Sequence, residues 1–273
     1  MTNEEAGGRL ETTVQGSVAT ITLHNPAKRN AMTTRMWESL PPLLAELAQN
    51  PSVLAVVLTG AGEHFCAGAD ITSLVDTLGI ESPLPPDESG IALSAPERAE
   101  EALAAFPKPT VAAIRGFCVG GGVELALACD LRIACNTARF GITPAKIGVY
   151  YPPRTTGRLV AAVGPAYAKQ LLFTGELILA DEAWRIGLVN QIAEPDALDN
   201  VLASLLETMK SRSQLSIRAG KAIVDAAATY GVDGPQGAVA TAREWQGVMV
   251  QSGDPQEGIS AFKERRAPEF PWR

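Results

Sequence analysis

Alternating apolar and polar residues near the start of the chain predict two short strands. The segments Arg9 to Val14 and Val18 to Leu23 have the period of two that is typical of a half-buried strand. The turn residues Gln15-Gly16-Ser17 lie between them, so we expect a β-hairpin. The next apolar run, Val53 to Leu58, is continuous and rich in β-branched residues, which predicts a strand buried on both faces.

Helical periodicity follows the hairpin. Thr33 suits the N-cap of a helix that runs to about Ala48, and Pro41-Pro42 inside it predicts a kink or a break. We expect two further helices, from about Glu97 to Ala105 and from about Val123 to Ala128. The Pro-rich stretch from about Ile80 to Pro96 indicates a mobile loop or an insertion.

The order of these elements predicts the fold class. Strands expected at Thr110 to Ile114 and Leu131 to Ala134 alternate with the helices, which favours an α/β core with parallel pairing. From about Pro165 the pattern becomes helical, with Asp181 expected to cap a short helix. Longer amphipathic segments follow at about 197–210, 214–229 and 235–250. We therefore expect a core over residues 1–195 and a helical region over 196–273.

Composition excludes several classes of protein. The chain has 273 residues, 46% of them hydrophobic, and a net charge of -7, which is usual for a folded globular protein and unfavourable for binding nucleic acid. No apolar run approaches the ~20 residues that span a membrane, and the acidic start lacks the features of a signal peptide. The four cysteines form no CxxC pair, so we expect no metal site and no disulfides. We expect a soluble, cytoplasmic protein.

Two glycine-bearing turns are the strongest chemical feature. Each turn, Phe65 to Asp70 and Gly116 to Glu124, follows a strand and opens a helix. Glycine lets a ligand approach the backbone closely, and a helix N-terminus presents unpaired N–H groups, so two such turns that converge would bind an oxyanion. The glycine spacing matches neither a dinucleotide-binding fingerprint nor a P-loop. The alternative is that these glycines only allow a helix to pack tightly on a sheet.

Two basic clusters stand out from the acidic background. Lys28-Arg29 lies near the start of the chain, and Lys263, Arg265 and Arg266 lie near its end. Each cluster alone is typical of a solvated surface, and together they are compatible with a small polyanionic ligand.

These segments together resemble the crotonase superfamily, also called the enoyl-CoA hydratase/isomerase family. The resemblance rests on Pro109 to Ile114 leading into Gly120 to Asp130, on Phe65 to Asp70, and on the terminal Ala261 to Arg266. It spans essentially the whole chain. It implies an α/β, crotonase-like spiral of repeated ββα units, with a helical C-terminal region that forms trimers or hexamers and covers the site.

The same resemblance implies the ligand and its contacts. The ligand would be an acyl-CoA thioester, with coenzyme A as part of the substrate and no separate cofactor. The thioester oxygen would accept hydrogen bonds from the N–H groups of Ala69 and Gly121. The coenzyme A contacts would be Ala67 with the neighbouring Asp70, Lys28 or Arg29, and Lys263, which lies in the C-terminal cluster.

One carboxylate is in place for acid–base chemistry, and a second is missing. Glu124 lies just inside the helix that the glycines open, where it would act as a base or an acid, or would only complement its own helix N-terminus. Family hydratases resemble one another in using a second glutamate, whose position here is Pro144. Tyr150 and Tyr151 follow on the same loop as candidate substitutes or as packing residues. The two histidines show no nucleophile pattern, which disfavours a serine hydrolase.

Three hypotheses are compatible with these residues. The leading one is hydration of a 2-enoyl-CoA through a thioester enolate, with Glu124 as the only glutamate. Double-bond isomerisation, or decarboxylation of a malonyl-type thioester, is the neighbouring alternative, because neither requires the same pair of glutamates. The third is an acyl-CoA-binding relative without turnover.

Overall fold

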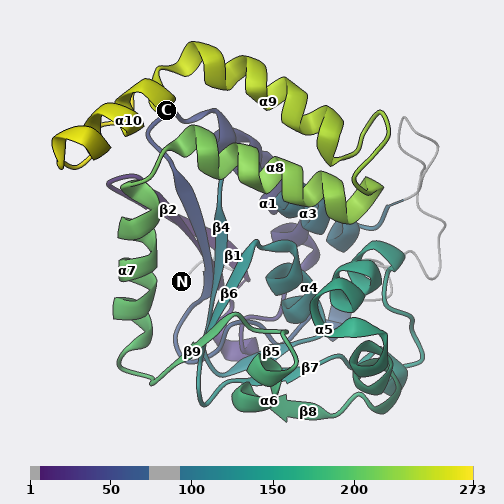
Figure 1. The fold of residues 1–273 in the computed structure, drawn as a ribbon. Coiled ribbons are helices and arrows are strands. Elements are labelled where there is room, and N and C mark those ends of the chain that lie inside the picture. Colours follow the sequence, from purple (N-terminus) through teal and green to yellow (C-terminus); the bar gives the residue numbers. More distant parts are fainter. Residues whose placement is uncertain (1–6, 74–92, 273) are drawn as a thin grey trace.

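The predicted hairpin forms the edge of the main sheet. The computed structural model describes residues 7–73 and 93–272. Strands β1 (Arg9–Gln15) and β2 (Val18–His24) pair antiparallel with Arg9 opposite His24, as expected. Four parallel strands continue the sheet in the order β1-β2-β3-β4-β6-β9, and they are β3 (Ala55–Gly60), β4 (Thr110–Ile114), β6 (Leu131–Cys135) and β9 (Gln191–Ala193). Figure 1 shows helices on both sides of this sheet.

Helix α1 (Thr34–Gln49) begins at the predicted residue, but it lacks the predicted break at its prolines. The Thr33 hydroxyl accepts a hydrogen bond from the Met36 N–H, which confirms the expected N-cap. The helix runs through Pro41-Pro42 without interruption. One face of α1 is buried in the core, and we attribute the continuity to this packing, which outweighs the hydrogen bonds that the prolines remove. The buried side chains are Met36, Trp37, Leu40, Leu44 and Leu47.

Helix α3 (Ala95–Ala104) begins two residues before the predicted start. Its N-terminus carries a capping box, in which the Ser94 hydroxyl accepts from the Glu97 N–H and the Glu97 carboxylate accepts from the Ser94 N–H. This box satisfies two of the unpaired N–H groups of the first turn. Most of the Pro-rich stretch that we interpreted as a loop, residues 74–92, lies outside the described residues.

A second, small sheet supports the glycine turn. Strands β5 (Phe117–Val119), β7 (Arg139–Gly141) and β8 (Leu177–Leu179) form it, with β5 parallel to β7 and β7 antiparallel to β8. None of the three was predicted, because three residues are too few to show a period. Helix α4 (Gly121–Ala128) follows β5 directly. Short 3-10 turns occur at Pro26–Lys28, Ile71–Ser73 and Pro144–Lys146.

The second half of the chain is helical, as expected. Helix α5 (Pro153–Thr174) is kinked at Gly164, and α6 (Ala180–Arg185) is short. Asp181 lies in the first turn of α6 while Leu179 occupies the N-cap, so the predicted cap was wrong by two residues. The predicted C-terminal helices are confirmed as α7 (Leu198–Lys210), α8 (Gln214–Tyr230) and α9 (Ala238–Ser252). An unpredicted helix, α10 (Asp254–Glu264), follows them.

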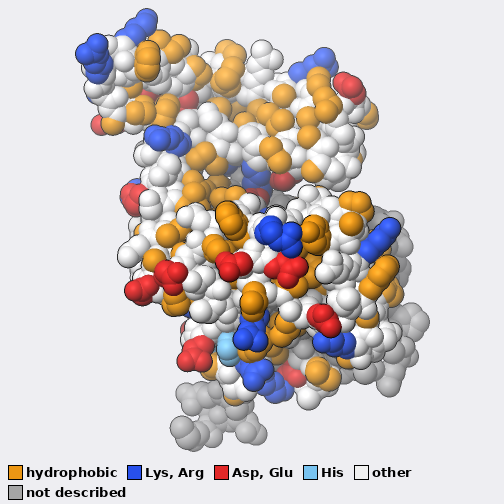
Figure 2. All heavy atoms as spheres, turned by 60° about the horizontal axis from the view of Figure 1, so that its bottom comes forward, with side chains coloured by type: hydrophobic (Ala, Val, Ile, Leu, Met, Phe, Trp, Pro, Cys, Tyr) orange, Lys and Arg blue, Asp and Glu red, His pale blue; other side chains and the backbone are white. Residues whose placement is uncertain are grey.

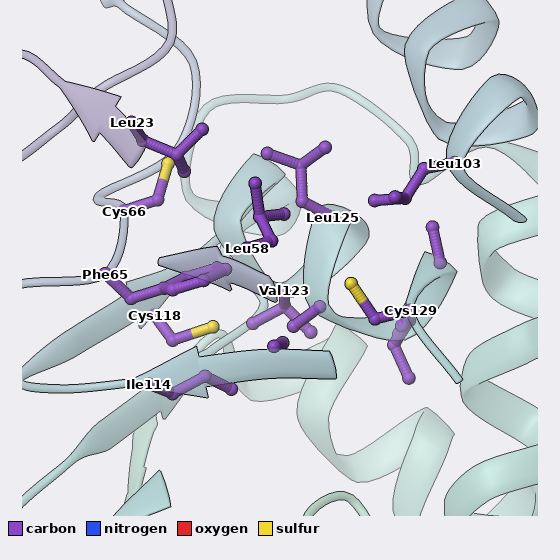
Figure 3. Packing of buried hydrophobic residues seen from close by; sticks show 14 of the residues in the cluster. Leu23, Leu58, Phe65, Cys66, Leu103, Ile114, Cys118, Val123, Leu125 and Cys129 are labelled. Carbon is purple, nitrogen blue, oxygen red and sulfur yellow. The ribbon is translucent and has the colours of Figure 1, made fainter. Parts of the chain in front are cut away.

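The core lies between the main sheet and helices α1, α3 and α4. Figure 3 shows Val123 beside Ile114 and Cys118, and Leu125 between Leu58 and Leu103. The side chains before and after Glu124 are therefore anchored in the core, and both are at most 1% exposed. Burying a leucine or valine side chain contributes roughly 1.5–3 kcal/mol, so α4 is held firmly beneath Glu124. Among the described residues, no helix has the length and apolar character needed to cross a membrane.

Candidate active site

The two predicted glycine turns converge in the fold. Val119 donates its N–H to the Cys66 carbonyl at 2.9 Å, and Cys66 donates its own N–H to the Phe117 carbonyl at 2.9 Å. A Cβ atom placed on Gly68 would lie 3.1 Å from the Val119 carbonyl oxygen and 3.5 Å from the Gly121 nitrogen. The backbone of the first turn therefore lies directly against the N-terminus of α4.

Glycine is required at two positions of the second turn. Gly120, the N-cap of α4, has a φ of 52° and a ψ of -118°, a conformation that residues with a side chain rarely adopt. A Cβ atom on Gly122 would lie 2.5 Å from the Cys66 carbonyl oxygen, which is closer than real atoms approach. The glycines thus allow the two backbones to pack closely, and this close packing brings the two turns together.

Two backbone amides are left without a protein partner at this junction. Neither the Ala69 N–H nor the Gly121 N–H donates to an acceptor within residues 7–73 and 93–272. A Cβ atom on Gly121 would lie 3.4 Å from the Ala69 nitrogen, so the two amides are neighbours. They come from separate segments and lie at a helix N-terminus, which is the arrangement that stabilises a developing oxyanion. The structure therefore brings both predicted amides to one place.

Glu124 lies in the first turn of α4 and is part-buried. Burial raises the pKa of its carboxyl well above the usual value, and the neighbouring Glu100 carboxyl raises it further. A carboxyl whose pKa lies nearer to neutral is suited to take and return protons at physiological pH.

Glu100 is a neighbour of Glu124 that the sequence analysis did not identify. It lies on α3 with 1% exposure, and its carboxyl is within hydrogen-bond reach of the Glu124 carboxyl. One oxygen, Oε2, accepts a hydrogen bond from the buried Thr155 hydroxyl and lies 3.9 Å from the Arg158 guanidinium. Burial raises the pKa of Glu100 to about 7 despite these partners.

The sequence does contain a signal for Glu100. Its position falls on the apolar stripe of α3, four residues after Pro96 and three before Leu103, and both of those residues are buried. A glutamate on the buried face of a helix is unusual unless a partner offsets its charge. The partners lie on α4 and α5, and only the tertiary structure identifies them.

The two candidate tyrosines have different surroundings. Tyr151 is 8% exposed, and its hydroxyl donates to the Gly120 carbonyl at 2.9 Å. Burial raises the pKa of Tyr151 well above its usual value, and the charge of Glu124 adds to this shift. Tyr150 is 83% exposed. Of the pair, Tyr151 alone is part of the carboxyl and glycine-turn cluster.

Four of the five predicted coenzyme A contacts lie close together. The Lys28 ammonium group lies 2.6 Å from the Asp70 carboxylate, and Ala67 donates its N–H to the Arg29 carbonyl at 3.0 Å. The Arg29 guanidinium covers the Phe117 ring at 5.1 Å. Burial works to raise the pKa of Asp70, but hydrogen bonds from Lys28 and Thr72 outweigh it and lower this pKa. Figure 2, in which the bottom of the view in Figure 1 comes forward, shows Lys and Arg side chains beside a histidine on that face.

Lys263 lies elsewhere in the protomer. It is on α10, which packs against α9 and, in Figure 1, lies at the upper left, away from α3 and α4. Pro144, at the position of the expected second glutamate, is buried at the start of a 3-10 turn. Within the described part of the chain, no group of three or more histidine, cysteine or acidic residues is placed to hold a metal ion.

Comparison with known proteins agrees with this geometry. Residues 13–273 match the enoyl-CoA hydratase/isomerase family. The chain is 38% identical to an (E)-benzylidenesuccinyl-CoA hydratase of Thauera aromatica, covering 94% of this chain and 96% of that protein. It is 36% identical to a short-chain-enoyl-CoA hydratase of Clostridium acetobutylicum, covering 92% and 93%.

Solved structures agree as well. A crystal structure of an enoyl-CoA hydratase/isomerase family member superimposes with a TM-score of 0.88, at 37% identity, over 98% of each chain. The chain belongs to the enoyl-CoA hydratase/isomerase family, the crotonase superfamily, and it has that family's mixed α/β fold with a helical C-terminal region.

Proposed function

We propose that this protein is an enzyme that reversibly hydrates a 2-enoyl-CoA through a thioester enolate. The observation that carries the proposal is the pair of free amides at Ala69 and Gly121, with the Glu124 carboxyl on the same helix turn. Relatives between 36% and 38% identical that are named hydratases support the same reaction.

The proposed mechanism uses one glutamate twice. The Glu124 carboxylate takes a proton from water while the water oxygen forms a bond to the β-carbon. The electron pair of the double bond moves to the thioester oxygen, where the N–H groups of Ala69 and Gly121 stabilise the enolate. The Glu124 carboxyl then returns a proton to the α-carbon. Protons balance, and no second acid is needed at Pro144.

The proposed contacts to coenzyme A divide between two protomers. Lys28, Arg29, Ala67 and Asp70 lie together. Lys28 or Arg29 would lie near the phosphates, and the Ala67 backbone would hold the adenine and pantetheine arm beside Asp70. Lys263 lies on α10, away from this cluster, so we propose that the α10 of a neighbouring protomer supplies it. This contact requires an oligomer, and we propose a homotrimer or a pair of trimers. The four described cysteines are free thiols, which supports a reducing compartment such as the cytoplasm.

The direct test is hydration of 2-enoyl-CoA substrates. Purified protein is mixed with 2-enoyl-CoA thioesters of several chain lengths, and the absorbance of the conjugated thioester is followed. We expect the absorbance to fall at a rate proportional to the protein concentration. No rate above that of buffer with any chain length would contradict the proposal.

Isomerisation and decarboxylation are separated by other substrates. Pro144 offers no acid, which leaves room for decarboxylation of a malonyl-type thioester, a reaction that needs the amide pair and no strong base. Release of CO₂ from methylmalonyl-CoA without hydration would favour that reaction. Conversion of a 3-enoyl-CoA without hydration would favour isomerisation, and tight acyl-CoA binding without any turnover would favour a binding protein.

A further inference from the structure

We propose that Glu100 is a positioning residue that shares one proton with Glu124 and so sets the pH at which Glu124 acts as a base. This inference rests on the proposed function for its role in turnover. Its structural content, a buried carboxyl pair that holds one proton, does not depend on the substrate.

The hydrogen-bond pattern of Glu100 calls for a shared proton. Oε2 accepts from the Thr155 hydroxyl, whereas Oε1 is buried and has no N–H or O–H donor among the described residues. The neighbour that remains within hydrogen-bond reach is the Glu124 carboxyl. Ionised carboxylates only accept hydrogen bonds, so two of them bond to each other only when one carries a proton.

The surrounding charges do not neutralise a doubly ionised pair. Arg158 is the basic group closest to Glu100, at 3.9 Å, but its other nitrogen is bound to Glu101 at 2.6 Å. If Glu100 and Glu124 were both ionised, the one guanidinium near them would be that of Arg158, which already binds Glu101. Among the described residues, four other titratable groups interact electrostatically with the pair, namely Glu97, Glu101, Tyr151 and Cys66. None of these four is a cation.

The pKa directions agree with the geometry. Burial raises the pKa of both carboxyls. The hydrogen bond between them lowers the pKa of Glu100 and raises that of Glu124, so Glu124 holds the shared proton. Two carboxyls in contact have two apparent pKa values that lie far apart. The pair therefore loses its first proton at a lower pH and its second proton at a much higher pH. The pair therefore keeps one proton, on Glu124, and Glu124 acts as a base only above the pH at which this proton leaves.

The shared proton has a defined role in hydration. Once the pair gives up its shared proton, Glu124 is ionised and takes the proton of the attacking water. Glu124 then passes that proton to the α-carbon, and the pair is again ionised. Glu100 is 1% exposed, which keeps it out of reach of a bound substrate, so it acts only through Glu124. Glu100 therefore adjusts Glu124 from α3 and does not take over the role of the carboxyl that is missing at Pro144.

The first test is the pH dependence of turnover in Glu100→Gln. Removing the neighbouring charge stabilises the ionised form of Glu124, so the acid limb of the kcat profile moves to lower pH by about one unit or more. Glu101→Gln is the matched control, because it removes a charge from the same helix and from the same Arg158 but keeps the contact between Glu100 and Glu124, so it shifts the acid limb less than Glu100→Gln does. Glu100→Asp, which keeps a carboxyl, shifts the limb less than Glu100→Gln. A profile of Glu100→Gln that is lower in rate but unmoved in pH would assign Glu100 a purely structural role.

The second test does not need turnover. Wild-type protein labelled with ¹³C at the glutamate carboxyl is titrated by NMR, and the two resonances are assigned by Glu124→Gln and Glu100→Gln. We expect one carboxyl of the pair to titrate above pH 6 in wild type and the Glu124 resonance to titrate at lower pH in Glu100→Gln. If every glutamate carboxyl titrates below pH 5, the inference is overturned. If the pair behaves as expected but no enoyl-CoA is hydrated, the proposed function fails and the carboxyl pair stands.

Discussion

The hydroxyl of Tyr151 connects the carboxyl cluster to the glycine turn. It donates to the carbonyl of Gly120, the residue whose unusual dihedrals start α4 and present the Gly121 amide. A tyrosine that is buried with its proton engaged in this way is suited to hold a backbone conformation. Loss of such a neutral hydrogen bond costs about 0.5–1.5 kcal/mol.

Replacing Tyr151 by Phe tests this role. We expect Tyr151→Phe to lower the free energy of unfolding by about 1 kcal/mol and to lower kcat, because the Gly120 carbonyl loses its buried donor. Urea denaturation and the hydration assay measure the two effects. Tyr150→Phe is the control, since Tyr150 is 83% exposed and should change neither quantity. Equal effects of the two variants would contradict this assignment.

Glu124 is the residue on which the proposed chemistry depends. We expect Glu124→Gln to lower kcat by about 10²–10⁴-fold, the usual loss when a general acid–base group is removed, because an amide cannot carry the proton. Binding of acyl-CoA, measured by calorimetry, should change little. A variant that turns over like wild type would contradict the mechanism.

Residues differ in how far the sequence predicts their roles. Glu124 and Pro144 are recognised within short motifs, because their neighbours in sequence are also their neighbours in space. The contact between Glu100 and Glu124 joins α3 to α4, and no local pattern specifies which residue of one helix faces the other. The sequence marks Glu100 as unusual and leaves its partner unknown.

At the scale of elements, the glycine turn depends on the close approach of two backbones. A methyl group at Gly122 would lie 2.5 Å from the Cys66 carbonyl oxygen, whereas one at Gly220, inside α8, would meet nothing within 4 Å. The two glycines therefore respond oppositely to the same substitution.

We expect Gly122→Ala to destabilise the protein by about 1–3 kcal/mol, because the added methyl forces α4 away from the first turn. The same shift separates Ala69 from Gly121 and should lower kcat. Gly220→Ala should stabilise the protein by about 0.5–1 kcal/mol through higher helix propensity and a less flexible unfolded chain. Thermal or urea denaturation compares the two variants. A Gly122→Ala protein as stable and active as wild type would show that the turns do not need this close contact.

Element length explains which elements the sequence predicts. Helices α1, α3, α4, α7, α8 and α9, and strands β1 to β4 and β6, are long enough to show a period or a continuous apolar run. Strands β5, β7 and β8 have three residues each, and their hydrogen bonds to one another define them. The uninterrupted α1 shows the opposite effect, in which packing overrides a local signal from two prolines.

At the scale of the whole molecule, the buried carboxyl pair makes stability depend on pH. A carboxyl whose pKa is raised on folding binds its proton more tightly in the folded state. Its contribution is therefore full below the unfolded value of 4.5 and is lost as the pH rises through about 7, the value for Glu100. Asp70 has a lowered pKa and acts in the opposite direction, losing its contribution as the pH falls below its usual value.

Comparison with Glu100→Gln isolates the contribution of the carboxyl pair, because the groups away from the pair cancel. We expect the wild-type free energy of unfolding to fall relative to that of Glu100→Gln between pH 4.5 and pH 7.5, by on the order of 2–3 kcal/mol. Urea denaturation at several pH values measures the difference. A difference that is constant across this range would show that folding does not raise the pKa of Glu100.

The outer surface of the C-terminal helices bears on assembly. Ile259 and Phe262 on α10 are 57% and 86% exposed in the single chain, and Met249 and Val250 on α9 are 39% and 67% exposed. Exposed apolar side chains on adjacent helices are typical of a protein–protein interface. This surface is where we propose that a neighbouring protomer packs.

We expect Phe262→Asp to reduce the molecular mass in solution from that of a trimer or hexamer toward that of a monomer, because a charge is costly to bury in an apolar interface. Light scattering after size-exclusion chromatography measures the mass. Phe173→Asp, at a residue on α5 that is 74% exposed, is the control and should leave the mass unchanged. The activity of Phe262→Asp should fall with assembly if Lys263 of a neighbour contacts coenzyme A. A wild-type protein that is monomeric at micromolar concentration would contradict the proposed assembly.

Local sequence is enough to specify the long helices, the central strands and the two glycine turns, because each depends on side-chain periodicity or on dihedrals that only glycine adopts readily. The same local motifs place Glu124 beside one turn and place Pro144 where the family resemblance implies a second glutamate. Tertiary structure decides that the Ala69 and Gly121 amides are neighbours, that the Tyr151 hydroxyl binds the Gly120 carbonyl, and that Glu100 meets Glu124. These contacts join segments that are distant along the chain, and only the packing of α3, α4 and the sheet determines their separations.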